Sequence, residues 1–134
     1  MSRLKVLLVD DNPEFLEVAA DFLSQHPGME IVGLARSGRQ ALQMAAELSP
    51  HLVIMDLSMP EMNGLEATRR IKTLPPPAPY VVILTLHEGA EFRSSAQGAG
   101  ADNFVTKSEF GDLLVPLILH HFPQLQIEPA NECA

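Results

Sequence analysis

Short runs of apolar residues alternate along the chain with longer segments in which apolar residues recur every three or four positions. The runs are typical of buried strands, and the longer segments are typical of helices with one apolar face. The strand-like runs cover residues 4–9, 30–35, 52–55, 80–84 and 101–106. Because a helical segment follows each run, the pattern predicts an α/β fold, with a doubly wound sheet of five parallel strands and helices on both faces.

Several residues predict where the helices begin. Asn12 can cap the first helix, and Asn63 with Gly64 can start the third. In the last helix, Pro116 predicts a late start or a kink near Asp112. A helical wheel of that segment places one apolar set towards the core and a second set near the opposite face. The core set is Phe110, Leu114 and Leu117, and the outer set is Val115, Leu119 and Phe122.

Polar residues follow four of the strand-like runs at the point where each run ends. Since parallel strands point the same way, their carboxyl ends meet at one edge of the sheet, where open α/β sheets bind their ligands. We therefore expect these polar side chains to converge at that edge. They are Asp10, Asp11, Asp56, Thr85 and Lys107.

The three acidic side chains predict a metal site with phosphoryl chemistry. Carboxylates in one pocket repel one another unless a cation shares the pocket. A hard divalent ion such as Mg²⁺, which prefers oxygen ligands, fits this set. With Lys107 opposite and the Thr85 hydroxyl nearby, Asp56 is arranged to attack phosphorus and become an aspartyl phosphate.

Composition and charge indicate the size of the protein, its location in the cell and the partners that it can bind. The 134 residues suit one domain, and no apolar run approaches the ~20 residues that a membrane span needs. The sequence carries no recognisable secretory signal, and the single Cys133 fits a reducing cytosol, so we expect a soluble cytoplasmic protein. The net charge of -8 argues against nucleic-acid binding by this domain.

At the strand ends the sequence resembles the receiver domain of two-component response regulators. The matching segments are Leu7 to Asp11, Asp56 with Met59 to Gly64, Ile83 to Thr85, and Gly100 to Lys107. The resemblance covers about residues 3–122 and implies the strand order 2-1-3-4-5. We expect a receiver domain over residues 1–122 and a tail or the start of a linker over 123–134.

The resemblance also implies an acceptor and a set of metal ligands. Asp56 would accept a phosphoryl group from a histidine kinase or a phosphotransfer protein. Asp11 would bind Mg²⁺ directly, Asp10 would help through a water molecule, and Ser58 would offer its backbone carbonyl. One departure is Ser108, because many receivers place a proline after the lysine, commonly with a cis bond.

Further roles concern the response to phosphorylation. Lys107 and Thr85 would hold phosphoryl oxygens, and Phe104 would turn inward as Thr85 moves. Ser58 and His87 each lie two residues past a site residue, and we expect them to tune the lifetime of the phosphoryl group. The resemblance also implies a phosphorylation-dependent homodimer through the fourth helix, fifth strand and fifth helix, a surface that many members of the family use. We expect Val115 and Leu119 to complete that surface.

Other readings stay open at this point. A Mg²⁺-dependent phosphohydrolase also uses an aspartyl nucleophile, but it typically carries a second acid two residues later, where this chain has Ser58. A receiver-like interaction module that no longer uses phosphate usually lacks an acid, the threonine or the lysine, all of which are present here. We expect a switch that catalyses only its own phosphorylation and dephosphorylation. Either it stands alone, or it is the isolated receiver of a DNA-binding regulator whose helix-turn-helix output domain is missing.

Overall fold

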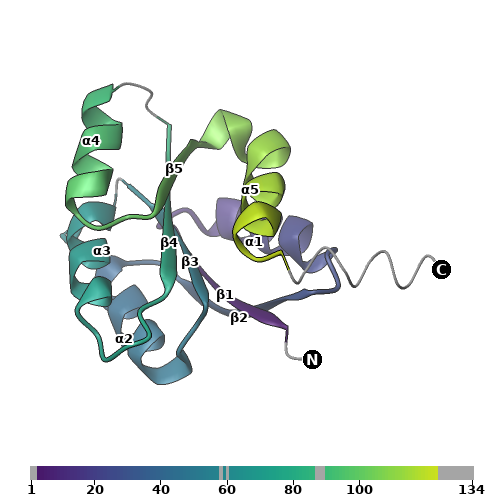
Figure 1. Ribbon diagram of the computed structural model, residues 1–134, viewed down its shortest axis with the longest axis horizontal. Coiled ribbons are helices and arrows are strands. Elements are labelled where there is room, and N and C mark those ends of the chain that lie inside the picture. The colour runs from purple at the N-terminus through teal and green to yellow at the C-terminus, as the bar shows by residue number, and fades with distance from the viewer. Residues whose placement is uncertain (1–2, 58, 60, 87–89, 124–134) are drawn as a thin grey trace.

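The computed structural model describes residues 3–57, 59, 61–86 and 90–123, in which strands and helices alternate (Figure 1). In chain order, the strands and the helices between them are β1 (Leu4–Val9), α1 (Pro13–Ser24), β2 (Met29–Ala35), α2 (Gly38–Leu48), β3 (Leu52–Asp56), α3 (Gly64–Lys72), β4 (Tyr80–Thr85), α4 (Ala90–Gly98) and β5 (Asn103–Thr106). After β5 come a 3-10 turn (Lys107–Glu109), a π-helical turn (Phe110–Leu114) and α5 (Val115–His121).

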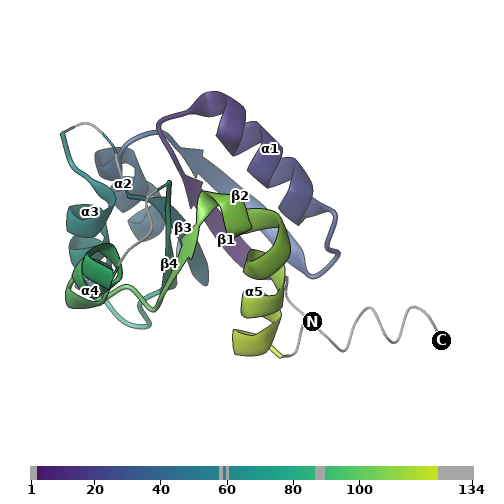
Figure 2. The same cartoon turned by 90° about the horizontal axis from the view of Figure 1, so that it is seen from above.

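The five strands form one parallel sheet in the order β2-β1-β3-β4-β5, which confirms the predicted fold class and strand order. Figure 2 shows α1 and α5 on one side of the sheet and α2, α3 and α4 on the other. Neighbouring residues in a strand point to opposite faces, so Val6 and Leu8 pack with α1 and α5, whereas Leu7 and Val9 pack with α2 and α3. The sheet is therefore buried on both faces.

The helix starts follow the predicted caps. Asn12 Oδ1 accepts hydrogen bonds from the backbone N–H groups of Glu14 at 3.0 Å and Phe15 at 3.3 Å. Asn63 Oδ1 accepts one from the N–H of Glu66 at 3.0 Å. Each side chain satisfies N–H groups that have no partner within the first helical turn. Asn12 and Asn63 thereby fix where α1 and α3 leave the sheet edge.

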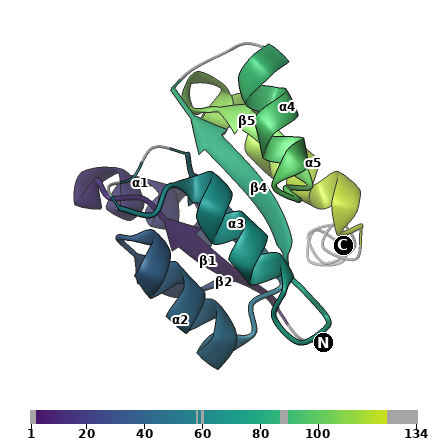
Figure 3. The same ribbon diagram turned by 90° about the vertical axis from the view of Figure 1, so that its left-hand side faces the viewer.

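Helices α2, α3 and α4 lie side by side over one face of the sheet (Figure 3). Their inward side chains are mostly small, with Ala41, Ala45, Ala67 and Ala96 all buried. β5 starts at Asn103, two residues later than predicted, because the N–H of Ala101 still bonds to the Ala96 carbonyl at the end of α4. None of the helices in the described part of the chain has the length and apolar character that crossing a bilayer requires.

The last helix starts late, as Pro116 predicted, but only part of the predicted division of its apolar faces is confirmed. Phe110, Leu114 and Ile118 are buried, while Leu117 is only half-buried. The predicted outer residues do not form a solvent-facing stripe, because all of them pack against the core. These residues are Val115, Leu119 and Phe122. A π-helical turn holds more residues than an α-helical turn, so residues 110–114 rotate the following side chains away from a uniform wheel.

Candidate functional site

The carboxyl ends of four strands carry the predicted polar residues to one edge of the sheet. Asp10 directly follows β1, Asp56 ends β3, Thr85 ends β4, and Lys107 directly follows β5. The strand registers place these ends level, since Val9 pairs with Met55 and Thr85 pairs with Thr106. The predicted convergence therefore follows from the sheet order.

The three acidic side chains form one cluster. Asp10, Asp11 and Asp56 each offer a carboxylate oxygen, and these oxygens lie within 4.8 Å of one another. Asp10 and Asp56 are buried, whereas Asp11 is exposed. One Asp10 oxygen also accepts a hydrogen bond from the N–H of Asn12 at 2.9 Å. The cluster is open to solvent on the Asp11 side and held rigidly on the Asp10 side.

Lys107 supplies positive charge to this cluster. Its Nζ lies 2.6 Å from Asp10 Oδ2 and 3.3 Å from Asp56 Oδ1. Burial by itself would lower the pKa of Lys107. The hydrogen bond to Asp10 and the negative charge of Asp56 outweigh that effect, so the pKa of Lys107 lies above its usual value. Lys107 is therefore a protonated donor at neutral pH.

Asp56 is the carboxyl group whose ionisation the site opposes. Burial, followed by the negative charge of Asp10, raises the pKa of Asp56 from 3.8 to about 6, although Lys107 acts in the opposite direction. One ammonium therefore does not fully compensate the buried negative charge. A further cation at the cluster would complete the compensation.

We predict that Asp56→Asn stabilises the metal-free protein at pH 7.5. Since the pKa of Asp56 is raised on folding, ionisation of Asp56 disfavours the folded state. This penalty is absent below about pH 3, where Asp56 is protonated in both states, and it grows until about pH 6. We expect Asp56→Asn to gain roughly 1–3 kcal/mol at pH 7.5 and only about 0.5 kcal/mol at pH 4. Urea unfolding in a chelator at both pH values measures this, and an equal difference at both would contradict it.

The loop from β3 to α3 returns close to Asp56. The N–H of Gly64 donates to the Leu57 carbonyl at 2.9 Å, and Leu57 N–H donates to the Leu84 carbonyl at 2.9 Å. A Cβ atom on Gly64 would lie 2.1 Å from the backbone oxygen of Asp56. Only glycine allows this approach of α3 to the end of β3.

Other predicted site residues occupy the same edge or lie outside the described residues. Thr85 is buried at the end of β4, Phe104 is buried within β5 opposite Ile83, and the Arg93 guanidinium lies 5.0 Å from the Phe104 ring centroid. Ser58 and His87, which were predicted to provide a carbonyl ligand and to tune lifetime, lie outside the described residues. Their predicted roles are therefore not tested.

Ser108 stands after the lysine with an ordinary peptide bond. Among the described residues, only the bond between Pro76 and Pro77 is cis, so Lys107 and Ser108 are joined in trans. The Ser108 hydroxyl lies 3.0 Å from Thr106 Oγ1, which donates to Glu109 at 2.8 Å. Hydroxyl and carboxylate contacts thus organise the turn that carries Lys107.

Phe15 is a site residue that sequence reasoning missed. Its ring centroid lies 4.4 Å from Lys107 Nζ, whereas its helical spacing with Ala19 and Phe22 indicates only a residue on the apolar face of α1. One signal was available in the sequence. Phe15 lies four residues after Asp11, in the first turn of the helix that follows the acidic pair, and an aromatic ring at that position can reach the strand-end cluster.

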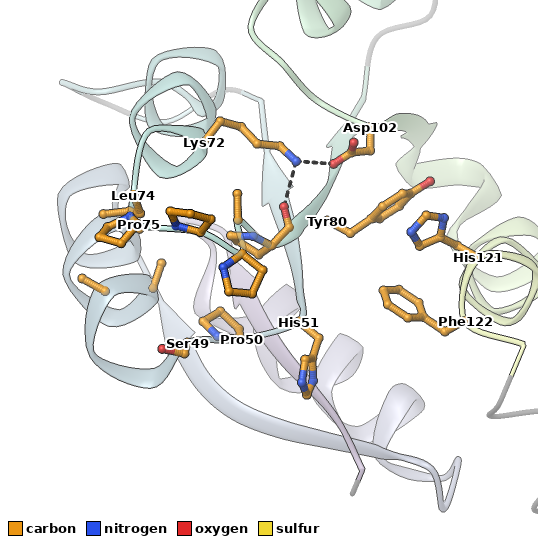
Figure 4. A pocket seen from close by; sticks show the side chains of 16 residues that line it. Ser49, Pro50, His51, Lys72, Leu74, Pro75, Tyr80, Asp102, His121 and Phe122 are labelled. Atoms are coloured by element: carbon orange, nitrogen blue, oxygen red, sulfur yellow. Dashed lines mark hydrogen bonds and ion pairs between the residues drawn. The ribbon is translucent and has the colours of Figure 1, made fainter.

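A cavity of about 900 Å³ lies at the opposite, amino end of the sheet (Figure 4). The charged side chains that line it already bind partners within the protein. Lys72 Nζ donates to the Pro79 carbonyl at 2.8 Å and to Asp102 at 2.6 Å. The Tyr80 and His121 rings face each other with centroids 3.7 Å apart. The cavity is separate from the acidic cluster, and its lysine is already neutralised.

The comparisons with known proteins agree with this arrangement. A family model described as the response regulator receiver domain matches residues 6–118. The chain belongs to this family. In a solved structure, the response regulator domain of Thermotoga maritima CheB matches with a TM-score of 0.79 and 32% identity, over 92% of this chain and 96% of that one. A LuxR-family two-component response regulator from Aurantimonas matches with a TM-score of 0.81 and 33% identity, over 98% of both chains.

Curated relatives of this receiver domain are longer proteins. A protein-glutamate methylesterase/protein-glutamine glutaminase from Geobacillus kaustophilus is 45% identical over 107 residues, which cover 80% of this chain and 31% of the relative. The protein of the same name from Nocardioides is 38% identical, over 96% of this chain and 38% of the relative. The chain thus spans about a third of the length of these relatives.

Proposed function

We propose that this receiver domain accepts one phosphoryl group on Asp56 from a histidine kinase or a phosphotransfer protein and signals by changing conformation. One observation carries the proposal. Asp56 ends the central strand with its carboxylate 3.3 Å from Lys107 Nζ and in one cluster with Asp10 and Asp11. A buried nucleophile, a cationic donor and further acidic oxygens are the groups that phosphoryl transfer to a carboxylate requires.

The transfer needs little covalent chemistry from the protein. A carboxylate oxygen of Asp56 forms a bond to phosphorus while the bond from phosphorus to the donor's imidazole nitrogen breaks, and that nitrogen keeps the electron pair. Lys107 then donates hydrogen bonds to a phosphoryl oxygen, and the Thr85 hydroxyl contacts another. These donors stabilise the negative charge on the oxygens of the transferred group.

The donor set at the cluster fits Mg²⁺. Three carboxylates within 4.8 Å, together with solvent access at Asp11, suit a hard ion that keeps some of its water. Asp11 and Asp56 would bind it directly, Asp10 would act through water, and the Ser58 carbonyl would add an oxygen. When bound, Mg²⁺ would neutralise part of the negative charge on the carboxylates and on the phosphoryl oxygens.

The proposed function is tested by incubating the protein with a small phosphodonor. In the presence of Mg²⁺, intact mass should show the addition of one phosphoryl group, and hydroxylamine should remove it because it cleaves acyl phosphates. The addition should fail with a chelator. A protein that gains no phosphoryl group, or gains one that resists hydroxylamine, would contradict the proposal.

We predict that Asp11→Ala weakens Mg²⁺ binding by about ten-fold or more, because it removes a hard oxygen ligand. Calorimetric titration of the unphosphorylated protein measures the affinity. Asp21→Ala, which removes a surface carboxylate from the middle of α1, is a control for the change in net charge. Wild-type affinity in Asp11→Ala, or an equal loss in Asp21→Ala, would argue against this metal site.

The conformational response is proposed to begin at Thr85 and Phe104. Thr85 would move towards the phosphoryl group, and Phe104 would follow into the space beneath it. Both residues are buried on neighbouring strands, with Phe104 opposite Ile83 and two residues before the partner of Thr85, which supports this coupling. Arg93 contacts the Phe104 ring, so a rotation of that ring would be transmitted to α4. Ser58 and His87 remain the residues proposed to set the lifetime of the phosphoryl group.

Phosphorylation is also proposed to promote a homodimer through the surface of α4, β5 and α5. The apolar residue that supports this is Leu113, which is 46% exposed in the turn after β5. With a beryllofluoride phosphate mimic, sedimentation should show dimers of the wild type and at least about ten-fold weaker association of Leu113→Glu. Val18→Glu, at a 65% exposed position on α1, is the control. A monomeric wild type at high concentration, or unaffected Leu113→Glu, would refute the dimer.

The output is proposed to lie outside the receiver itself. Its relatives include proteins named as methylesterases and a regulator of the LuxR family. We propose that the chain itself is a cytoplasmic switch, with a receiver domain over residues 1–122 and a tail or linker from residue 123. The serine at position 58, where phosphohydrolases carry their second acid, supports a switch over a hydrolase.

A further inference from the structure

We propose that Phe15 positions the Lys107 ammonium for phosphoryl transfer, with its aromatic face as the third contact of that ammonium. This inference rests on the proposed function and adds a positioning residue to it. The ring centroid lies 4.4 Å from Lys107 Nζ, within the range of a cation–π contact. The two other contacts are Asp10 Oδ2 at 2.6 Å and Asp56 Oδ1 at 3.3 Å.

The Phe15 ring restricts the movement of the Lys107 ammonium, which the two carboxylates alone do not. Lysine has a long flexible side chain, and two acceptors leave its ammonium free to move between them or out to solvent. The side chain of Lys107 is only 14% exposed. An aromatic face attracts a cation while excluding water, and such a contact strengthens when it is desolvated. Phe15 therefore confines the ammonium next to Asp56.

Phe15 is held in place from two directions. Its N–H donates to the side chain of Asn12, which fixes its backbone in the first turn of α1. Its ring packs edge-to-face with the ring of Phe110, with centroids 5.5 Å apart and planes at 68°. Phe110 follows Lys107 by three residues and also contacts Phe22, with centroids 5.4 Å apart. The same aromatic group thus anchors both the ring and the turn that carries the lysine.

The contact also suits the movement that the reaction requires. Lys107 is hydrogen-bonded to Asp10 before transfer and must donate to a phosphoryl oxygen on Asp56 afterwards. A carboxylate partner is directional and would oppose that shift. The face of Phe15 is broad and attracts the ammonium without a directed hydrogen bond, so it can stay in contact at both positions.

Three variants separate this role from simple packing. Phe15→Leu removes the aromatic face, Phe15→Tyr keeps it, and Phe22→Leu removes a contact of Phe110 without touching Lys107. With saturating Mg²⁺, Phe15→Leu should lower beryllofluoride affinity and the initial rate of phosphoryl uptake about five- to ten-fold. Phe15→Tyr should stay within two-fold of the wild type on both measures, a range expected from the retained ring face. Phe22→Leu should leave both unchanged even if it lowers stability.

Magnetic resonance of the metal-free protein gives a readout that packing alone would not move. The ε-methylene protons of Lys107 should be shifted upfield by the ring in the wild type and in Phe15→Tyr. They should return towards ordinary values in Phe15→Leu. Unchanged uptake in Phe15→Leu, an equal loss in Phe22→Leu, or no ring shift in the wild type would each overturn the role of Phe15. Phosphorylation that survives in Asp56→Asn would instead overturn the proposed function.

Discussion

Asp56→Asn is expected to lose phosphorylation completely, whether the phosphoryl group comes from a small donor or from a kinase. The amide that replaces the carboxylate carries no negative charge and is too weak a nucleophile to attack phosphorus. Intact mass after incubation with the phosphodonor and Mg²⁺ measures the loss. The change should not unfold the protein, because it removes a buried charge whose ionisation the fold opposes.

Asp102→Asn is the matched control for this loss. Asp102 is also an aspartate, but it lies before β5 and pairs with Lys72 at the far end of the sheet. The Asp102→Asn variant should therefore gain a phosphoryl group on Asp56 like the wild type. If Asp56→Asn still gained a hydroxylamine-sensitive phosphoryl group, a different carboxylate would be the acceptor.

Gly64→Ala is expected to have the largest effect on stability. The added Cβ would lie 2.1 Å from the Asp56 backbone oxygen and 3.0 Å from the Leu57 Cα, and neither backbone atom can rotate away. Overpacking against backbone should cost about 3 kcal/mol or more. Because the displaced atoms belong to Asp56 itself, phosphoryl uptake should fall as well. Urea unfolding and the phosphodonor assay measure the two effects.

Gly98→Ala is the control for the loss of stability expected in Gly64→Ala. Gly98 ends α4, and a Cβ there would meet nothing within 4 Å. Gly98→Ala should change stability by no more than about 1 kcal/mol, and it is expected to increase it, because alanine restricts the unfolded chain. Equal stabilities of Gly64→Ala and Gly98→Ala would show that the approach of α3 to β3 is less tight than described.

The convergence of the polar residues at one sheet edge was predictable because it depends only on the positions of the strands in the sequence and on their parallel direction. Once the apolar runs define parallel strands, Asp10, Asp56, Thr85 and Lys107 must reach one sheet edge in any sheet that places those strands side by side. The helix caps at Asn12 and Asn63 were equally predictable. A capping side chain acts within a few residues of its own position.

Features that depend on three-dimensional packing were not predictable from periodicity. The wheel of the last helix assumed a uniform rotation per residue, and the π-helical turn before Val115 broke it. Apolar spacing places Phe15 on the inner face of α1, but it does not show which partner the aromatic ring will meet. The raised pKa of Asp56 likewise depends on burial and on the distance to Asp10.

The stacking of Tyr80 on His121 has a consequence for spectroscopy. Tyr80 is the only tyrosine and the sequence has no tryptophan, so the ultraviolet fluorescence of the protein comes from the start of β4. That emission senses the packing of the end of α5 against β4, at the sheet edge opposite to Asp56. A fluorescence change on phosphorylation would therefore report a signal that has crossed the length of the sheet.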